Sequence, residues 1–161
     1  MMSPIRFCLC LASTLLLALS CESEVREINI KQNLYIDNYI QNHYADNEVV
    51  RNDGAIRVVL ADSLANAPAI ERGDSAYLFY AGYTFGESGP MGQFALDSGM
   101  VRVGSGDLIT GLDRGLIGAR LGQEALIIFP AQLGYGTHAV GMVPENTALL
   151  FYILVADIKN N

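Results

Sequence analysis

The spacing of apolar residues separates a short leader from the rest of the chain. Thirteen mostly apolar residues run from Phe7 to Leu19, after a single arginine at Arg6. A helix that spans a bilayer needs about twenty apolar residues, so this run is too short to cross a membrane, and it matches the apolar part of a secretory signal. We therefore predict that residues 1–20 are an export signal and do not belong to the fold.

The predicted signal ends with a small residue followed by a cysteine, Ser20-Cys21. This pair resembles the bacterial lipobox, in which the cysteine is acylated and becomes the mature N-terminus, although Ala18 stands where that motif prefers leucine. The alternative is ordinary cleavage that leaves a free Cys21. Since Cys8 and Cys10 leave with the signal, the mature chain keeps one cysteine and forms no internal disulfide. We expect lipid attachment at Cys21 and an exported protein at a bacterial membrane, with the outer membrane as the expected one, facing the periplasm or the surface.

Residues 21–48 are predicted to combine a polar tether with a short amphipathic helix. The stretch CESEVREINIKQ is charged and polar, which is typical of a tether. From Leu34 to Tyr44 the apolar side chains fall close to helical spacing and predict a helix, with His43 as a surface residue near its end. Residues 49–161 then form the folded domain.

Within 49–161, apolar runs and turn residues predict an α+β fold. A turn is expected at Asn52-Asp53-Gly54, and glycines mark GESGPMGQ, residues 86–93, as a flexible connection. Thr110 lies three residues before Asp113, a capping-box spacing that predicts a helix of two or three turns. Strands with one short helix favour an antiparallel sheet that curls around the helix, with the N-terminal helix as an extension. The strands are expected at 55–60, 76–85, 100–104, 124–129 and 147–158.

Charge and motif content exclude several classes of function. Ten Lys and Arg against seventeen Asp and Glu give a net charge of −7, so no basic patch of useful size can form and a nucleic-acid partner is excluded. The sequence has no phosphate loop, no histidine pair at metal spacing and no serine-nucleophile motif. Asp97, Asp107 and Asp113 suit scattered surface acids better than a metal set, and GSGDLITG lacks the glycine spacing of a dinucleotide loop. We expect neither a metal nor a cofactor.

Rotation about the peptide bond before a proline is a reaction that needs neither. Its barrier is about 18–20 kcal/mol because the amide has partial double-bond character. The twisted transition state has lost conjugation, so it prefers a dry pocket more than the planar ground state does. Apolar walls and one or two hydrogen-bond donors can therefore lower the barrier. Tyr135, between Gly134 and Gly136, is suited to this role because its ring forms wall and its hydroxyl donates.

Several motifs occur together in the second half of the chain. They are a glycine-led turn into LITGLDRGL, the turn GARLGQEA, a strand ending at Pro130, LGYG around Tyr135, and Val143-Pro144 before the closing strand. Upstream, GDSAYLFYAGYTF ends its strand with a Tyr-x-Gly pattern. Over roughly residues 70–158 the sequence closely resembles the FKBP-type peptidyl-prolyl isomerases. The resemblance implies an antiparallel sheet curled around a short helix, with an apolar cavity between them.

The resemblance implies catalytic roles for three residues. Tyr135 matches the phenol that donates to a substrate carbonyl. Ile109 matches the residue before the helix whose backbone N–H binds a substrate carbonyl, and Tyr80 matches the first aromatic of the wall. For Tyr135 the flanking glycines also favour a site residue over a core residue, because a core tyrosine seldom needs glycine on both sides.

The resemblance also implies substrate-binding roles. Leu112 takes the floor, where many members have tryptophan. Phe94 matches the aromatic after the long connection, but Ala95 follows it where the family has aspartate, so the rim carboxylate is absent or moved. Taken alone, Leu112 and Phe151 also suit plain core. The implied substrate-binding residues are Phe94, Leu108, Leu112, Met142 and Phe151.

Three hypotheses of function follow. The leading one is a lipid-anchored prolyl isomerase that assists the folding of exported proteins and binds proline-containing polypeptides. The alternative is a non-catalytic FKBP-like chaperone or partner-binding module, motivated by Ala95 and Leu112. A third is a structural component of a surface complex, recruited through the helix near Tyr39.

Overall fold

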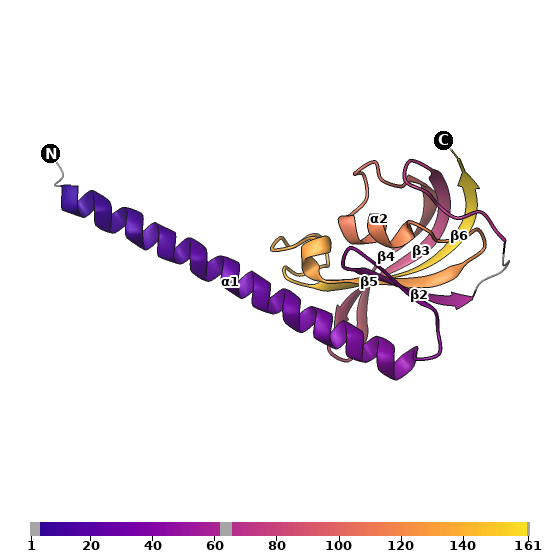
Figure 1. The fold of residues 1–161 in the computed structure, drawn as a ribbon, viewed down its shortest axis with the longest axis horizontal. Coiled ribbons are helices and arrows are strands. Elements are labelled where there is room, and N and C mark those ends of the chain that lie inside the picture. The colour runs from indigo at the N-terminus through magenta and orange to yellow at the C-terminus, as the bar shows by residue number, and fades with distance from the viewer. Residues whose placement is uncertain (1–3, 62–65, 161) are drawn as a thin grey trace.

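The computed structural model describes residues 4–61 and 66–160, and describes side chains from residue 22 onward. Six antiparallel strands form one curled sheet in the order β1-β2-β5-β6-β3-β4 (Figure 1). The predicted α+β architecture is therefore confirmed. The strands are β1 Val49–Asn52, β2 Ala55–Ala61, β3 Ser75–Gly86, β4 Gly89–Arg102, β5 Glu124–Phe129 and β6 Ala148–Lys159. The helices are α1 Pro4–His43, α2 Thr110–Leu116 and the 3-10 helix η1 Ala131–Leu133.

The two helices α1 and α2 lie on opposite faces of the sheet (Figure 1). On the inner face, Leu112 and Leu116 of α2 share one buried core with residues of β3, β5 and β6. On the outer face, Ile36 and Ile40 of α1 share a second core with side chains such as Ile128. The sheet therefore buries apolar side chains on both faces, and the cavity described below belongs to the inner core.

Turn chemistry explains both hairpins of the sheet. Asp53 and Gly54 have φ values of 45° and 89°, the left-handed pair that a two-residue hairpin turn needs, so the predicted turn is confirmed. The flexible connection predicted for residues 86–93 is wrong. Gly86 pairs directly with Gly89, and β4 then continues to Arg102. The glycines there serve a tight turn, with φ of 109° at Gly89, rather than mobility.

The N-terminal segment also differs from the prediction. Residues 21–32, predicted as a polar tether, lie within α1, which is one continuous helix of 40 residues. The face of the helix that meets the domain there carries amides, Asn29 and Gln32, which are 6% and 4% exposed. A periodicity rule that counts apolar residues does not register such a face. Among the described residues no helix is both long and apolar enough to cross a membrane.

Helix α2 occurs where the sequence predicts it, but without the capping box. Its N-cap is Ile109, which makes no side-chain cap, and Thr110 is already helical. The carboxylate of Asp113 instead accepts the N–H of Gly104 at 2.7 Å, because the turn after β4 folds back against the helix. This bond fixes the start of α2 relative to β4.

Candidate functional site

A cavity of about 250 Å³ lies between α2 and the inner face of β3, β4 and β6. Ligand pockets for drug-sized molecules start at about 300 Å³, so this one suits a single side chain with its flanking amides. The lining comes from three strands, from α2 and the turn before it, and from the loop after η1. The lining residues are Leu78, Tyr80, Phe94, Ala95, Val101, Asp107, Leu108, Ile109, Leu112, Tyr135 and Phe151.

Aromatic rings form the base and one wall of the cavity. Phe151 of β6 is 4% exposed, and its ring meets Phe94 edge-on at 5.6 Å between centroids. Phe129 stacks on Phe151 at 6.0 Å, and Tyr80 lies 6.3 Å from Phe151. Gly82 makes room for this cluster. A Cβ there would lie 2.8 Å from Phe94 and 3.0 Å from Phe151, so any larger residue would displace the rings.

The backbone N–H of Ile109 offers a hydrogen-bond donor at the cavity. Ile109 is the N-cap of α2, where N–H groups have no partner within the helix. Among the described residues no hydrogen bond accounts for this N–H. Ile109 has an extended backbone, with ψ of 139°, directly before the helix begins, so its N–H lies ahead of the first turn of α2.

Tyr135 lines the same cavity from the loop after η1, and its side chain is half-buried. The N–H groups of Gly134 and Gly136 both donate to the Ala131 carbonyl, at 2.9 and 2.8 Å, which folds the chain into a tight turn around Tyr135. Gly136 has φ of 59°, a conformation that favours glycine. Glycine at position 136 therefore has a conformational reason, while a Cβ at Gly134 would lie 3.0 Å from Leu149.

A second phenol, Tyr80, lines the same cavity and interacts electrostatically with Tyr135. Burial raises the pKa of Tyr80 above its usual value, and electrostatic interactions with Asp97 and Tyr135 raise it further. Tyr80 therefore keeps its proton at neutral pH and remains a hydrogen-bond donor.

Seven of the eight residues predicted for the site line this one cavity. Met142 does not, and its side chain is 73% exposed. Val140 and Val143 bond to each other across a tight turn that has Gly141 at φ 58°, so Met142 lies at the tip of the turn while Val143 is buried. The seven that meet are Tyr135, Ile109, Tyr80, Phe94, Leu108, Leu112 and Phe151.

Asp107 is a residue of the cavity that the sequence patterns did not indicate. Asp107 is exposed at the rim of the cavity, and its carboxylate accepts the hydroxyl of Ser105 at 2.8 Å. Its position directly before Leu108-Ile109 was the available signal. Ala95, the residue after Phe94, also lines the cavity but has no carboxylate. Asp107 supplies a carboxylate at the rim instead. Among the described residues there is no cluster of three metal-ligating side chains.

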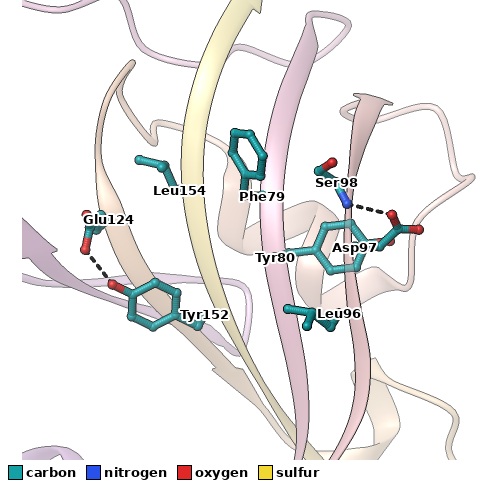
Figure 2. Close-up of a pocket in the computed structure, with 8 residues that line it drawn as sticks. All are labelled: Phe79, Tyr80, Leu96, Asp97, Ser98, Glu124, Tyr152 and Leu154. Carbon is teal, nitrogen blue, oxygen red and sulfur yellow. Dashed lines mark hydrogen bonds between the residues drawn. The ribbon is translucent and has the colours of Figure 1, made fainter.

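A second hollow, of about 390 Å³, lies on the outer face of the sheet (Figure 2). Its lining comes from β3, β4, β5 and β6, and includes Phe79, Leu96 and Tyr152. Figure 2 shows that the polar groups here are engaged with one another. The Tyr152 hydroxyl donates to Glu124 at 2.5 Å, and the Ser98 N–H donates to Asp97. The inner cavity, with an uncommitted backbone donor, is the better candidate for chemistry.

Comparison with known proteins identifies the family. Residues 67–156 match the family described as FKBP-type peptidyl-prolyl cis-trans isomerase. The chain is 32% identical over 84 residues to FK506-binding protein 2 of Gibberella zeae, an alignment that covers 50% of this chain and 43% of that protein. It is 42% identical over 59 residues to peptidyl-prolyl cis-trans isomerase FKBP10 of Mus musculus, covering 36% of this chain and 10% of that protein.

Solved structures agree on the fold. FkpA from Escherichia coli superimposes with a TM-score of 0.62 and 19% identity, over 98% of this chain and 74% of that one. The three FKBP domains of wheat FKBP73 give a TM-score of 0.61 with 17% identity, over 71% of this chain and 50% of that one. The chain thus spans less than half the length of the curated relatives above. The matched region covers more than half of this chain and contains every residue that lines the inner cavity, and the chain belongs to the FKBP-type peptidyl-prolyl cis-trans isomerase family.

Proposed function

We propose that this protein accelerates cis–trans rotation about the peptide bond before proline in polypeptide substrates. The observation that carries the proposal is that Tyr135 and the N–H of Ile109 line one small cavity whose other walls are aromatic and aliphatic. That combination suits an amide that must lose its planarity, because the twisted amide is less polar than the planar one and gains more from leaving water.

Each part of the cavity has a distinct task in this mechanism. The rings of Phe151 and Phe94 with Leu112 hold the prolyl ring away from water. The Ile109 N–H and the Tyr135 hydroxyl donate to substrate carbonyls on either side of the bond that rotates. These hydrogen bonds hold the substrate in the orientation from which the amide rotates, so part of the barrier is removed by positioning. No proton leaves either donor.

An isomerisation assay on a short proline peptide tests the proposal. The chain from Glu22 onward is suitable because it keeps every described side chain. We expect acceleration by the wild type and roughly tenfold lower kcat/KM in Tyr135→Phe, because one hydrogen bond in the transition state contributes about 1.4 kcal/mol. Tyr152→Phe is the matched control, since its hydroxyl bonds to Glu124 on the outer face. A folded wild type that leaves the rate unchanged would refute catalysis.

We further propose that the protein acts outside the cytoplasm, anchored by a lipid on Cys21, and assists the folding of exported proteins. The apolar run of residues 7–19 and the Ser20-Cys21 pair support this. Gln32, which docks on the domain, lies eleven positions after Cys21 on the helix, and this corresponds to about 16 Å. Incorporation of labelled palmitate into wild type but not into Cys21→Ser tests the anchor. Equal labelling of the two would contradict it.

A second candidate function is to hold unfolded chains without catalysis. Exposed apolar side chains of β3 and β4 on the outer face favour it, since Phe79 is 49% exposed, Leu96 75% and Met100 46%. This reading predicts that suppression of client aggregation persists in Tyr135→Phe and weakens in Leu96→Ser. If Tyr135→Phe alone abolishes the suppression of aggregation, the holding function depends on the inner cavity and is not a separate function of the outer face.

A further inference from the structure

The side chain of Gln32 joins α1 to both ends of the segment that carries Tyr135. Gln32 is 4% exposed. Its Oε1 accepts the N–H of Ala131 at 2.7 Å, and its Nε2 donates to the carbonyl of Asn146, also at 2.7 Å. These partners lie 99 and 114 residues away in the chain, so the contact is purely tertiary.

Two further hydrogen bonds close this contact into a circuit. The carbonyl of Ala131 accepts the N–H of Gly136 at 2.8 Å, and the carbonyl of Gly136 accepts the N–H of Asn146 at 2.7 Å. The circuit therefore runs from Gln32 to Ala131, to Gly136, to Asn146 and back to Gln32. Tyr135 lies directly before Gly136, inside the segment that the circuit encloses.

The neighbouring residue on the same helix face strengthens the contact. Asn29 is 6% exposed, its Oδ1 accepts the N–H of Gln132 at 3.3 Å, and its Nδ2 donates to Val25 within α1. Helix α1 thus supplies acceptors for two consecutive N–H groups at the start of η1. A buried N–H or carbonyl without a partner is unfavourable, so the circuit resists opening at any one of its bonds.

We propose that Gln32 is a positioning residue for the isomerase site, through which α1 holds the segment that carries Tyr135. The inference rests on the proposed function. A primary amide satisfies both partners at once because it carries a donor and an acceptor on the same planar group. Methionine fills a similar volume and satisfies neither. The segment that places the Tyr135 phenol at the cavity then loses the two hydrogen bonds by which Gln32 joins its ends to α1.

Kinetics of Gln32→Met test the proposal in the full chain. We expect roughly tenfold lower kcat/KM, because small displacements of a catalytic group have large effects on rate. Gln41→Met is the matched control, since Gln41 lies on the same helix but is exposed, and we expect its kcat/KM to be unchanged. If Gln32 acts through the phenol, Gln32→Met in a Tyr135→Phe background should cause little further loss. An equal loss in both backgrounds, or none in either, would overturn the proposal.

Amide hydrogen exchange supplies a second readout that needs no isomerase activity. In Gln32→Met we expect faster exchange at Ala131, Gly136 and Asn146, with the amides of β5 unchanged. If exchange speeds up at β5 to the same extent, Gln32 only stabilises the whole domain and the positioning role is wrong. If the wild type proves inactive while exchange behaves as expected, the proposed function fails and the attachment of the turn by α1 is upheld.

Discussion

Gly111 sets how closely α2 approaches the sheet beneath the candidate site. A Cβ on Gly111 would lie 2.2 Å from the ring of Phe129, and one on Gly115 would lie 2.2 Å from Ile127. Phe129 in turn stacks on Phe151 at the base of the cavity. The lack of a side chain at Gly111 therefore lets α2 pack closely on β5, and a larger residue would push the helix away from the strand.

We expect Gly111→Ala to lower the free energy of unfolding by about 1–3 kcal/mol. Alanine favours the helix by about 1 kcal/mol, but overpacking against Phe129 outweighs that gain. Gly99→Ala is the control, since a Cβ at Gly99 has no neighbour within 4 Å. Urea denaturation of both variants measures the difference. A Gly111→Ala protein at least as stable as wild type would show that the helix moves without strain.

At the scale of elements, Arg57 of β2 holds the C-terminal end of α2. Its side chain is 5% exposed, and Nη1 donates to the carbonyls of Gly115 and Ile117, each at 2.7 Å. A cation is favourable at this end of a helix because the last carbonyls are unsatisfied and carry partial negative charge. Burial lowers the pKa of Arg57 from its usual value, but arginine remains charged at neutral pH.

Arg57→Leu is expected to reduce the free energy of unfolding by about 2–3 kcal/mol, because two buried carbonyls lose a charged donor. Thermal and urea unfolding both report this. Arg102→Leu is the control, since Arg102 is exposed on β4, and we expect a change within about 0.5 kcal/mol. Similar effects of the two substitutions would mean that the Arg57 contacts contribute little.

The docking of α1 gives a prediction for alkaline pH. Tyr35 and Tyr39 pack against Phe85, with centroids 5.9 and 5.0 Å apart, and Tyr35 donates to the Phe85 carbonyl at 3.3 Å. Burial raises the pKa of both tyrosines from 10 to about 12, with smaller contributions from Glu87 for Tyr35 and Tyr44 for Tyr39. The folded state thus holds these protons more tightly than the unfolded state.

Because the folded pKa is the higher one, this contribution to stability is intact below pH 10 and falls as the pH rises from 10 to 12. Urea denaturation across this range, followed by circular dichroism, measures the decline. Tyr39→Phe should flatten it, since phenylalanine cannot ionise. An unchanged slope in that variant would assign the decline to other groups.

At the scale of the whole molecule, one sheet serves two cores. Strand β2 contributes to both, since Ala55 faces the inner core while Ile56 and Val58 face α1. The inner core contains the cavity, and the outer core holds the helix that carries Gln32. A substitution that loosens α1 should therefore affect both stability and the Tyr135 turn.

Ile36→Ala tests this link, because Ile36 is fully buried between α1 and the sheet. We expect a loss of about 2–4 kcal/mol in the free energy of unfolding, and faster amide exchange at Gly136 than at β5. Leu34→Ala on the same helix is the control, since Leu34 is 61% exposed and should change little. Uniform exchange across the domain in Ile36→Ala would argue against the link.

Much of the fold follows from local patterns in the sequence. Alternation and apolar runs locate β2, β5 and β6 because side chains two apart share a face of a strand. Gly136 beside Tyr135 indicates a tight turn because positive φ favours glycine. The resemblance then assigns the lining of the cavity, and seven of its eight predicted residues meet there.

Only the tertiary structure shows the contacts that join distant segments. Asn29 and Gln32 look like a polar tether in the sequence, yet they are buried because their amides bond to backbone groups about a hundred residues away. Asp113 has the spacing of a capping residue but bonds to Gly104 instead, and Met142 points outward because Val143 takes the buried position. Local periodicity determines which residues can face a core. Which polar group meets which depends on how the elements pack, and that is decided only when the chain has folded.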